Sequence, residues 1–177
     1  MVWSLRENDS MNIYFLRHGI AADMGPPGQG DAGRPLTAEG KEKMRQIARG
    51  MKSLEIKHPV VWTSPYRRAL ETAQIVSQAM RSPKKPFLFE PLEPMGDPRF
   101  LVQELIKKSA SLQDIMIVGH EPYLSSLISV LAFGSETGAV EMKKGSLCKV
   151  SANSLCYGAC GRIEWLLAPK QLIALKQ

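Results

Sequence analysis

The sequence predicts a three-layer α/β fold, in which a mainly parallel β-sheet is covered by helices on both faces. Two observations lead to this prediction. Segments with strand and helix patterns alternate along most of the chain, and this βαβα order is typical of a parallel sheet. In addition, Ile115–Val118 reads IMIV with no polar residue, which indicates a strand that is buried on both faces.

The first strand is expected at Met11–Leu16, where the sequence MNIYFL is apolar and rich in β-forming residues. A loop should follow at 25–33, because GPPGQGDAG consists largely of glycine and proline. The first helix is expected after Thr37, a typical N-cap residue. Its apolar residues have the spacing of one helix face, and they are Met44, Ile47, Ala48, Met51 and Leu54.

The middle of the chain continues the alternation. Val60–Thr63 is the second expected strand, and it ends at Ser64-Pro65. Tyr66–Met80 should be a helix, because its small and apolar residues recur at helical spacing. A short strand at Phe87–Phe89 and a helix at Phe100–Lys107 are expected next.

The last third of the chain closes the sheet. Ile115–Val118 is the expected central strand, and Pro122 should open a helix that runs to about Phe133. Leu147–Ser151 and Arg162–Leu167 are expected to form a final strand pair. Residues 1–10 are interpreted as an N-terminal extension, so that one domain occupies residues 11–177, a length that suits a single core.

Composition excludes several classes of protein. The chain is 44% hydrophobic and 23% charged, which is ordinary for a soluble globular protein and argues against disorder, collagen and coiled coil. The net charge of +6 suits an acidic substrate, but Lys and Arg never run longer than two residues, so nucleic acid is not an expected partner. No apolar run approaches the ~20 residues of a membrane span. A cytoplasmic location without a membrane partner is therefore expected.

The three cysteines, Cys148, Cys156 and Cys160, all lie late in the chain. An odd number in this position does not suggest a disulfide framework, and free thiols are expected. Cys156 and Cys160 are too few for a closed zinc site, and no histidine lies near them in sequence. No metal and no cofactor are predicted.

Three segments that follow predicted strands carry arginine or histidine. They are Arg17-His18-Gly19, Ser64-Pro65-Tyr66-Arg67-Arg68 and Gly119-His120-Glu121-Pro122. Ligands of parallel α/β sheets bind outside the carboxyl ends of the strands, so the three segments should meet at one edge. Two arginines and two histidines that converge there form a site suited to a dianion.

These residue types suit the transfer of a phosphoryl group. Arg17 and Arg68 would clamp the phosphoryl oxygens, because a guanidinium presents a fixed fork of donors. Helix N-termini after Ser64-Pro65 and Glu121-Pro122 would add backbone donors. His18 would attack phosphorus, form a phosphohistidine and lose the phosphoryl group to water. A backbone carbonyl of its own loop would fix its other ring nitrogen, and a protonated His120 would stabilise the transition state.

His58 provides a contrast within the same sequence. It precedes Pro59 in a loop between a helix and a strand, and no cation motif surrounds it. It is therefore interpreted as a structural or surface residue.

The three motifs together resemble those of the histidine phosphatase superfamily, which includes phosphoglycerate mutases and acid phosphatases. Leu16-Arg17-His18-Gly19 resembles its signature, residues 64–73 resemble its second motif, and residues 118–122 its third. The resemblance implies a phosphoglycerate mutase-like fold. It also implies a phosphate pocket whose catalytic and binding residues are Arg17, His18, Arg68 and His120. Arg67 is not included, because the motif places its arginine directly before alanine.

A narrower resemblance points to the compact SixA-type phosphohistidine phosphatases. It rests on Arg34-Pro35-Leu36-Thr37, on Glu39-Gly40 behind it, and on Pro94-Met95-Gly96-Asp97. The resemblance extends from Met11 to about Leu167. Residues 1–10 lie outside it.

The substrate class depends on a general acid. Superfamily members that hydrolyse esters supply a carboxylic acid after the third strand, because the leaving alkoxide needs a proton. Here that region is short, and Glu93 and Asp97 are its candidates. Glu93 also fits a turn carboxylate, and Asp97 also fits an N-cap for the next helix. Because a P–N bond needs less help to break, a site without a strong acid favours phosphohistidine over esters.

The expected partner is therefore a phosphorylated histidine-containing protein, such as a phosphotransfer domain in a signalling relay. One alternative is a phosphomonoesterase for small phosphorylated molecules such as sugar phosphates. A mutase is disfavoured, because no extra segment is present to enclose a phosphorylated intermediate. An alternative of another class is an inactive module that binds phosphorylated ligands.

Overall fold

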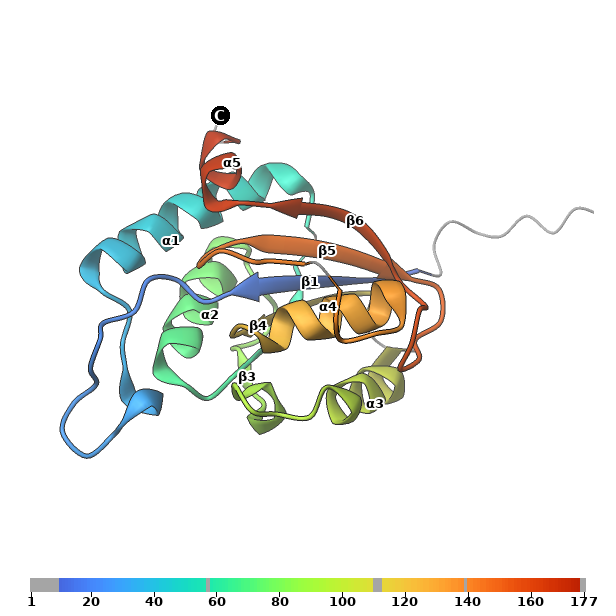
Figure 1. The fold of residues 1–177 in the computed structure, drawn as a ribbon. Helices are drawn as coiled ribbons and strands as arrows, with labels where there is room; N and C mark the ends of the chain where they lie inside the picture. Colours follow the sequence, from blue (N-terminus) through green and yellow to red (C-terminus); the bar gives the residue numbers. More distant parts are fainter. Residues whose placement is uncertain (1–9, 57, 110–112, 139, 176–177) are drawn as a thin grey trace, which may run out of the picture.

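The computed structural model describes residues 10–56, 58–109, 113–138 and 140–175. One six-stranded sheet has the strand order β3-β2-β4-β1-β5-β6 (Figure 1). The strands are β1 (Met11–Arg17), β2 (Val60–Thr63), β3 (Phe87–Leu88), β4 (Asp114–Gly119), β5 (Leu147–Ala152) and β6 (Arg162–Leu167). The first four run parallel, whereas β5 is antiparallel to β1 and β6 to β5. The predicted mainly parallel sheet is confirmed.

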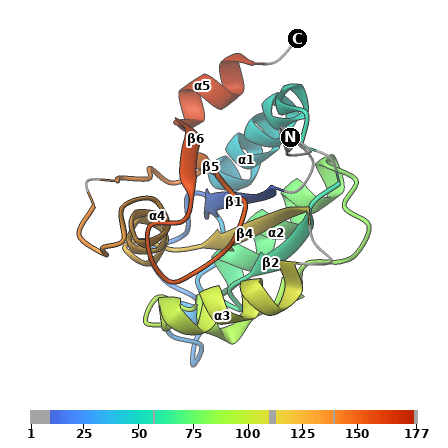
Figure 2. The same cartoon turned by 90° about the vertical axis from the view of Figure 1, so that its right-hand side faces the viewer.

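Helices cover both faces of the sheet, as expected (Figure 2). They are α1 (Ala38–Met51), α2 (Arg67–Ala79), α3 (Pro98–Ser109), α4 (Tyr123–Phe133) and α5 (Pro169–Ala174). Short 3₁₀ turns lie at η1 (Asp31–Gly33), η2 (Lys52–Leu54) and η3 (Glu90–Leu92). Residues of α1, α2 and α5 pack on one face, and residues of α3 and α4 pack on the other.

The central strand β1 joins the two hydrophobic cores. Ile13 and Phe15 belong to the core under α3 and α4, whereas Tyr14 and Leu16 belong to the core under α1 and α2. All four side chains are buried, which explains why the strand is continuously apolar rather than alternating. This two-sided burial is the physical basis of the three-layer architecture.

Most predicted boundaries agree with the structure to within one or two residues. The Oγ1 of Thr37 accepts the N–H of Gly40 at 2.9 Å, which confirms the predicted N-cap of α1. Leu54 does not continue the helix but lies in η2. The C-terminal helix α5 is not expected from the sequence, because its six residues are too few for a clear helical pattern. Its Leu172 is fully buried in the core against α1.

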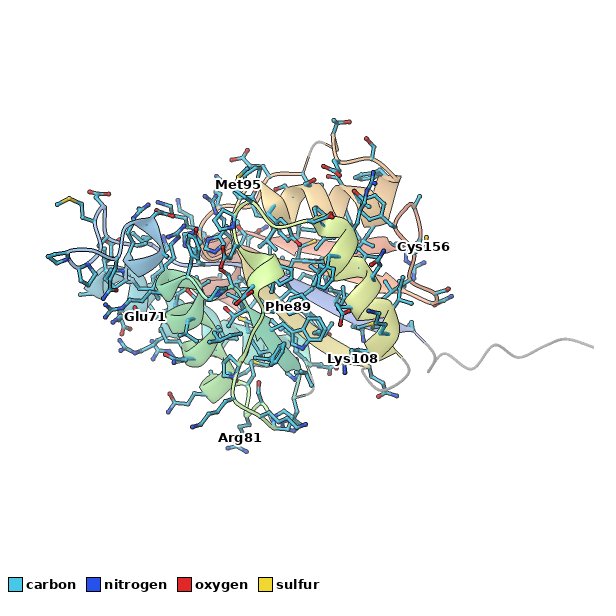
Figure 3. All side chains as sticks on the ribbon, turned by 90° about the horizontal axis from the view of Figure 1, so that it is seen from below. Glu71, Arg81, Phe89, Met95, Lys108 and Cys156 are labelled. Carbon is cyan, nitrogen blue, oxygen red and sulfur yellow. The ribbon has the colours of Figure 1, made fainter. Side chains whose placement is uncertain are left out.

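The predicted extension at residues 1–10 lies, apart from Ser10, outside the described residues. Cys148, Cys156 and Cys160 are free thiols, as expected. Figure 3 shows Cys156 at the end of the molecule opposite Glu71 of α2. His58 is exposed, which confirms its interpretation as a surface residue.

The sheet register brings the predicted motifs together. Arg17 at the end of β1 pairs with Gly119 at the end of the neighbouring parallel strand β4. The N–H of His18 donates to the carbonyl of Gly119 at 3.1 Å, and the N–H of Ser64 donates to the carbonyl of Val118 at 3.0 Å. The carboxyl ends of β1, β2 and β4 therefore meet at one edge, as the sequence predicts.

Candidate active site

His18 lies directly after β1 and is 6% exposed. Its Nδ1 is 2.7 Å from the carbonyl oxygen of Gly19, and its Nε2 is 3.3 Å from Nε of Arg68. An arginine nitrogen only donates, so Nε2 must be the acceptor and Nδ1 must carry the hydrogen. This arrangement leaves the lone pair on Nε2, where a nucleophile needs it. The backbone carbonyl predicted to fix the ring is that of Gly19.

The surroundings of His18 also favour its neutral form. Burial lowers its pKa from 6.5 to about 4, and the neighbouring positive charge of Arg68 acts in the same direction. The hydrogen bond to Gly19 opposes this shift. The imidazole is therefore unprotonated, and competent as a nucleophile, across the neutral range.

Arg68 lies in the first turn of α2 and is 6% exposed, an unusual position for an arginine. Its Nε donates to His18, and its two terminal nitrogens contact Asp31 of η1. The side chain of its neighbour Arg67 is instead exposed and forms a salt bridge of 3.0 Å with Glu71. The structure thus separates the two adjacent arginines as the motif implies.

Arg17, the last residue of β1, reaches the same pocket. Its Nη1 donates to the carbonyl of Met142 at 2.6 Å. Burial lowers its pKa, while the carboxylate of Glu121 opposes that shift. Its Nε is buried and has no hydrogen-bond partner among the described residues, so a donor remains for a bound anion.

His120 follows β4 and is 2% exposed. Its Nε2 is 2.8 Å from Oγ of Ser64, and Ser64 Oγ itself accepts the N–H of Tyr66. When the Ser64 hydroxyl donates its hydrogen to Nε2, the ring hydrogen of His120 lies on Nδ1. That atom is buried and has no partner in the described part of the chain. In that tautomer it is a second unpaired donor at the site.

The protonated His120 expected from the sequence concerns the transition state. In the empty pocket, burial lowers the pKa of His120 to about 3, with His18 and Arg68 acting in the same direction. His120 is therefore neutral in the empty pocket. A bound dianion would reverse part of this effect, because it would compensate the neighbouring positive charges.

The four predicted residues line a single pocket of about 280 Å³. The pocket also contains four ionisable residues that sequence reasoning missed: Asp31, Arg34, Glu121 and Lys144. Arg34 and Glu121 lie inside the motifs that carry the family resemblance, so the sequence contains a signal for these two residues. Asp31 and Lys144 come from loops, where strand-end reasoning gives no signal.

The acids expected from the 90–97 segment do not line this pocket, to which that segment contributes Pro94. Oδ1 of Asp97 accepts the N–H of Arg99 at 2.8 Å, which agrees with its alternative role as a cap of α3. Glu121 is instead the half-buried carboxyl at the pocket. Burial raises its pKa, and one of its oxygens accepts a hydrogen bond from Ser125 while the other has no partner among the described residues.

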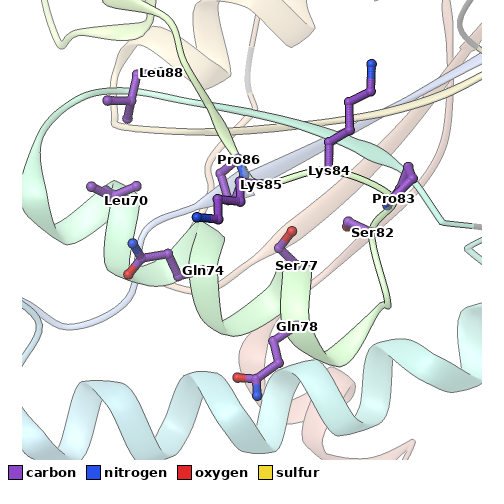
Figure 4. Close-up of a pocket in the computed structure, with 10 residues that line it drawn as sticks. All are labelled: Leu70, Gln74, Ser77, Gln78, Ser82, Pro83, Lys84, Lys85, Pro86 and Leu88. Carbon is purple, nitrogen blue, oxygen red and sulfur yellow. The ribbon is translucent and has the colours of Figure 1, made fainter.

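A larger depression of about 570 Å³ lies between α2 and the segment before β3 (Figure 4). Its lining includes Leu70, Ser77, Lys85 and Leu88, but none of the predicted site residues. Within the described ranges, no group of three His, Cys, Asp or Glu side chains is placed to hold a metal ion. None of the helices in the described part of the chain is long and apolar enough to span a membrane.

Comparisons with known proteins show which family and which relatives the chain resembles. A family model of the histidine phosphatase superfamily (branch 1) matches residues 13–88. An uncharacterized protein of Picosynechococcus sp. is 33% identical over 138 residues, which are 77% of this chain and 82% of that protein. Phosphohistidine phosphatase SixA of Escherichia coli (strain K12) is 27% identical over 165 residues, or 92% of this chain and 96% of that protein.

The fold agrees with a solved structure of the protein histidine phosphatase SixA complexed with tungstate. The TM-score is 0.80 at 23% identity, and the match covers 92% of this chain and 99% of the other.

Proposed function

The chain belongs to the histidine phosphatase superfamily and is a phosphatase, and we propose that its substrate is phosphohistidine carried by a protein. In this proposal His18 is the nucleophile and Arg17 and Arg68 bind the phosphoryl oxygens. His120 also binds phosphate, through its unpaired Nδ1–H, and stabilises the transition state.

The observation that carries the phosphatase chemistry is the pairing of His18. Its Nδ1–H is held by the carbonyl of Gly19 at 2.7 Å, so one defined lone pair on Nε2 faces Arg68. The lone pair attacks phosphorus, and the bond between phosphorus and the substrate nitrogen breaks. Water then attacks phosphorus, the bond to Nε2 breaks, and inorganic phosphate leaves. Each step exchanges one bond to phosphorus, and His18 is regenerated.

The choice of substrate rests on where the carboxyl groups lie. Neither Glu93 nor Asp97 lines the pocket, so the segment expected to supply the acid for ester hydrolysis contributes no carboxyl group to it. Hydrogen bonds from Arg34 and Arg68 hold the pKa of Asp31 below its usual value, so this carboxyl is a poor proton donor. A substrate whose nitrogen leaves easily fits such a pocket. The similarity to SixA over most of both chains supports the same choice.

One observation favours the second candidate, a phosphomonoesterase for small esters. Glu121 lines the pocket, and burial raises the pKa of its carboxyl toward the range of a general acid. If Glu121 protonates a leaving alkoxide, Glu121→Gln lowers ester turnover by about 10²-fold or more. Under the phosphohistidine proposal, that substitution leaves turnover of phosphohistidine protein within a small factor of wild type.

The test is a substrate profile with His18→Ala as the control. Wild type and variant are assayed on a phosphohistidine protein and on para-nitrophenyl phosphate. We expect a higher kcat/KM on the phosphoprotein and loss of both activities in His18→Ala. Undiminished turnover by the variant would exclude His18 as nucleophile, and a clear preference for esters would replace the substrate proposal. Trapping of an acid-labile, alkali-stable phosphoenzyme on His18 excludes an inactive binding module.

A further inference from the structure

Asp31 contacts the phosphate-binding arginine Arg68 at two points, although 37 residues separate them in sequence. Nη1 of Arg68 donates to the backbone carbonyl of Asp31 at 2.8 Å, and Nη2 donates to its carboxylate at 2.9 Å. Figure 1 shows the blue loop between β1 and α1, which carries Asp31, beside α2. The loop thus places an anion against the group that must hold the substrate phosphate.

The contacts account for all three nitrogens of the Arg68 guanidinium. Nε donates to the lone pair of His18, and the two terminal nitrogens donate to Asp31. Three of the five N–H donors of an arginine are therefore engaged, which leaves about two for a ligand. A phosphoryl group that binds Arg68 therefore either uses these two remaining donors beside Asp31 or takes donors that Asp31 and His18 hold in the empty pocket.

The carboxylate of Asp31 is placed so that it can move away from Arg68. Its side chain is 52% exposed, whereas that of Arg68 is 7% exposed. Its second carboxylate oxygen accepts from Nη1 of Arg34 at 2.7 Å, and Nε of Arg34 is anchored on the carbonyl of Ala22 at 2.7 Å. Arg34 therefore offers the carboxylate a partner when Arg68 turns to a phosphoryl group.

We propose that Asp31 is a resident anion that competes with the substrate phosphoryl group and with product phosphate for Arg68, and so sets the affinity of the pocket for phosphate. In the empty pocket, its carboxylate and the lone pair of His18 hold Arg68. An incoming phosphoryl dianion, with its higher charge, takes Arg68 from both and frees the lone pair for attack. After hydrolysis, the return of Asp31 to Arg68 weakens the hold on inorganic phosphate and promotes its release.

The test measures binding of inorganic phosphate by calorimetry, which needs no turnover. Asp31→Asn removes the charge and keeps the shape, and it should bind phosphate about tenfold more tightly than wild type, a change of about 1.4 kcal/mol. Asp31→Glu keeps the charge and should stay close to wild type. The matched control is Asp23→Asn, which removes the same charge from an exposed position of the same loop that does not line the pocket. It should leave phosphate affinity nearly unchanged.

Equal or weaker binding of phosphate by Asp31→Asn overturns the proposal, because Asp31 would then position Arg68 rather than compete for it. If Asp31→Asn does not fold, as judged by circular dichroism, Asp31→Ser carries the same prediction. The inference rests on the proposed phosphate pocket, and the calorimetry separates the two. A wild-type protein that does not bind phosphate refutes both, whereas a wild-type protein that binds it and an Asp31→Asn variant that binds no more tightly refute only the role of Asp31.

Discussion

Thr72 links the loop that carries His18 to the helix that carries Arg68, and substitution of its hydroxyl tests whether this link positions His18. Its Oγ1 accepts the N–H of Gly19 at 3.1 Å and donates to the carbonyl of Arg68 at 2.7 Å. The side chain is fully buried. Since the carbonyl of Gly19 in turn holds the ring of His18, one hydroxyl connects the loop that carries His18 to the helix that carries Arg68. Thr72→Val keeps the shape of the side chain and removes both hydrogen bonds.

The expected cost follows from the group that is left unpaired. The buried N–H of Gly19 loses its acceptor, and an unpaired buried donor costs about 1–3 kcal/mol. The carbonyl of Arg68 loses less, because it also accepts within the helix. In a domain of this size, a loss of 1 kcal/mol lowers the melting temperature by about 2–4 °C. Thr72→Val should therefore melt several degrees below wild type.

The assay combines a thermal melt with turnover. If Gly19 moves, Nε2 of His18 moves with it, and kcat should fall by about tenfold or more, since small misplacements of reacting groups are costly. Thr72→Ser keeps the hydroxyl and is the matched control, so it should retain most of the turnover. A Thr72→Val protein that melts and turns over like wild type would show that this hydrogen bond does not position the nucleophile.

Three further predictions follow from the structure. The pKa values of His18 and His120 fall from 6.5 to about 4 and about 3, so the unfolded chain binds more protons than the folded chain below pH 6.5. The free energy of unfolding should be highest above that pH and fall toward pH 4, by up to about 1.4 kcal/mol per pH unit for each histidine. Denaturant titrations of wild type and His120→Asn at several pH values check this. If the free energy of unfolding changes equally with pH in both proteins, the prediction is contradicted. Ser64→Ala leaves Nε2 of His120 without its partner at 2.8 Å, so stability should drop by about 1–3 kcal/mol and turnover should fall in steady-state assays. Gly40→Ala, which elsewhere in a helix stabilises by up to about 1 kcal/mol, should destabilise here in thermal melts, because the added Cβ would lie 2.1 Å from the carbonyl of Ile20.

The sheet could be predicted because its pattern is local. In β4, Ile115 and Ile117 face one core and Met116 and Val118 face the other, so burial on both sides leaves a continuous apolar run that can be read directly. Helix α5 could not be predicted, because only six residues form it and its stability comes from the packing of Leu172 against α1, a segment far away in the sequence. Propensity describes a segment in isolation, whereas such a helix depends on tertiary packing.

The difference between local sequence pattern and tertiary packing also explains which site residues could be predicted. Residues at strand ends, such as His18 and His120, are placed by the sheet register, and the rule for parallel sheets anticipates where they meet. Asp31 and Lys144 stand on loops, so their approach to the pocket depends on the path of the backbone and not on any periodic pattern. The hydroxyl of Thr72 belongs to a motif that the sequence displays, yet its bond to Gly19 joins segments 53 residues apart and emerges only from the packing of α2 against the β1 loop.

The electrostatics of the pocket make phosphate binding and protonation interdependent. Burial lowers the pKa of both histidines, and Arg17 and Arg68 act in the same direction. The arginines proposed to bind the phosphoryl group therefore also help to keep His18 unprotonated, which is the state that the proposed nucleophile needs. A bound dianion compensates those positive charges, so the pKa of His120 must rise when the ligand enters. Because the two effects are linked, binding of phosphate should take up protons below neutral pH, and substitution of His120 should reduce that uptake. The protonated His120 expected from the sequence would then be a property of the occupied pocket, and the neutral His120 of the structure a property of the empty one.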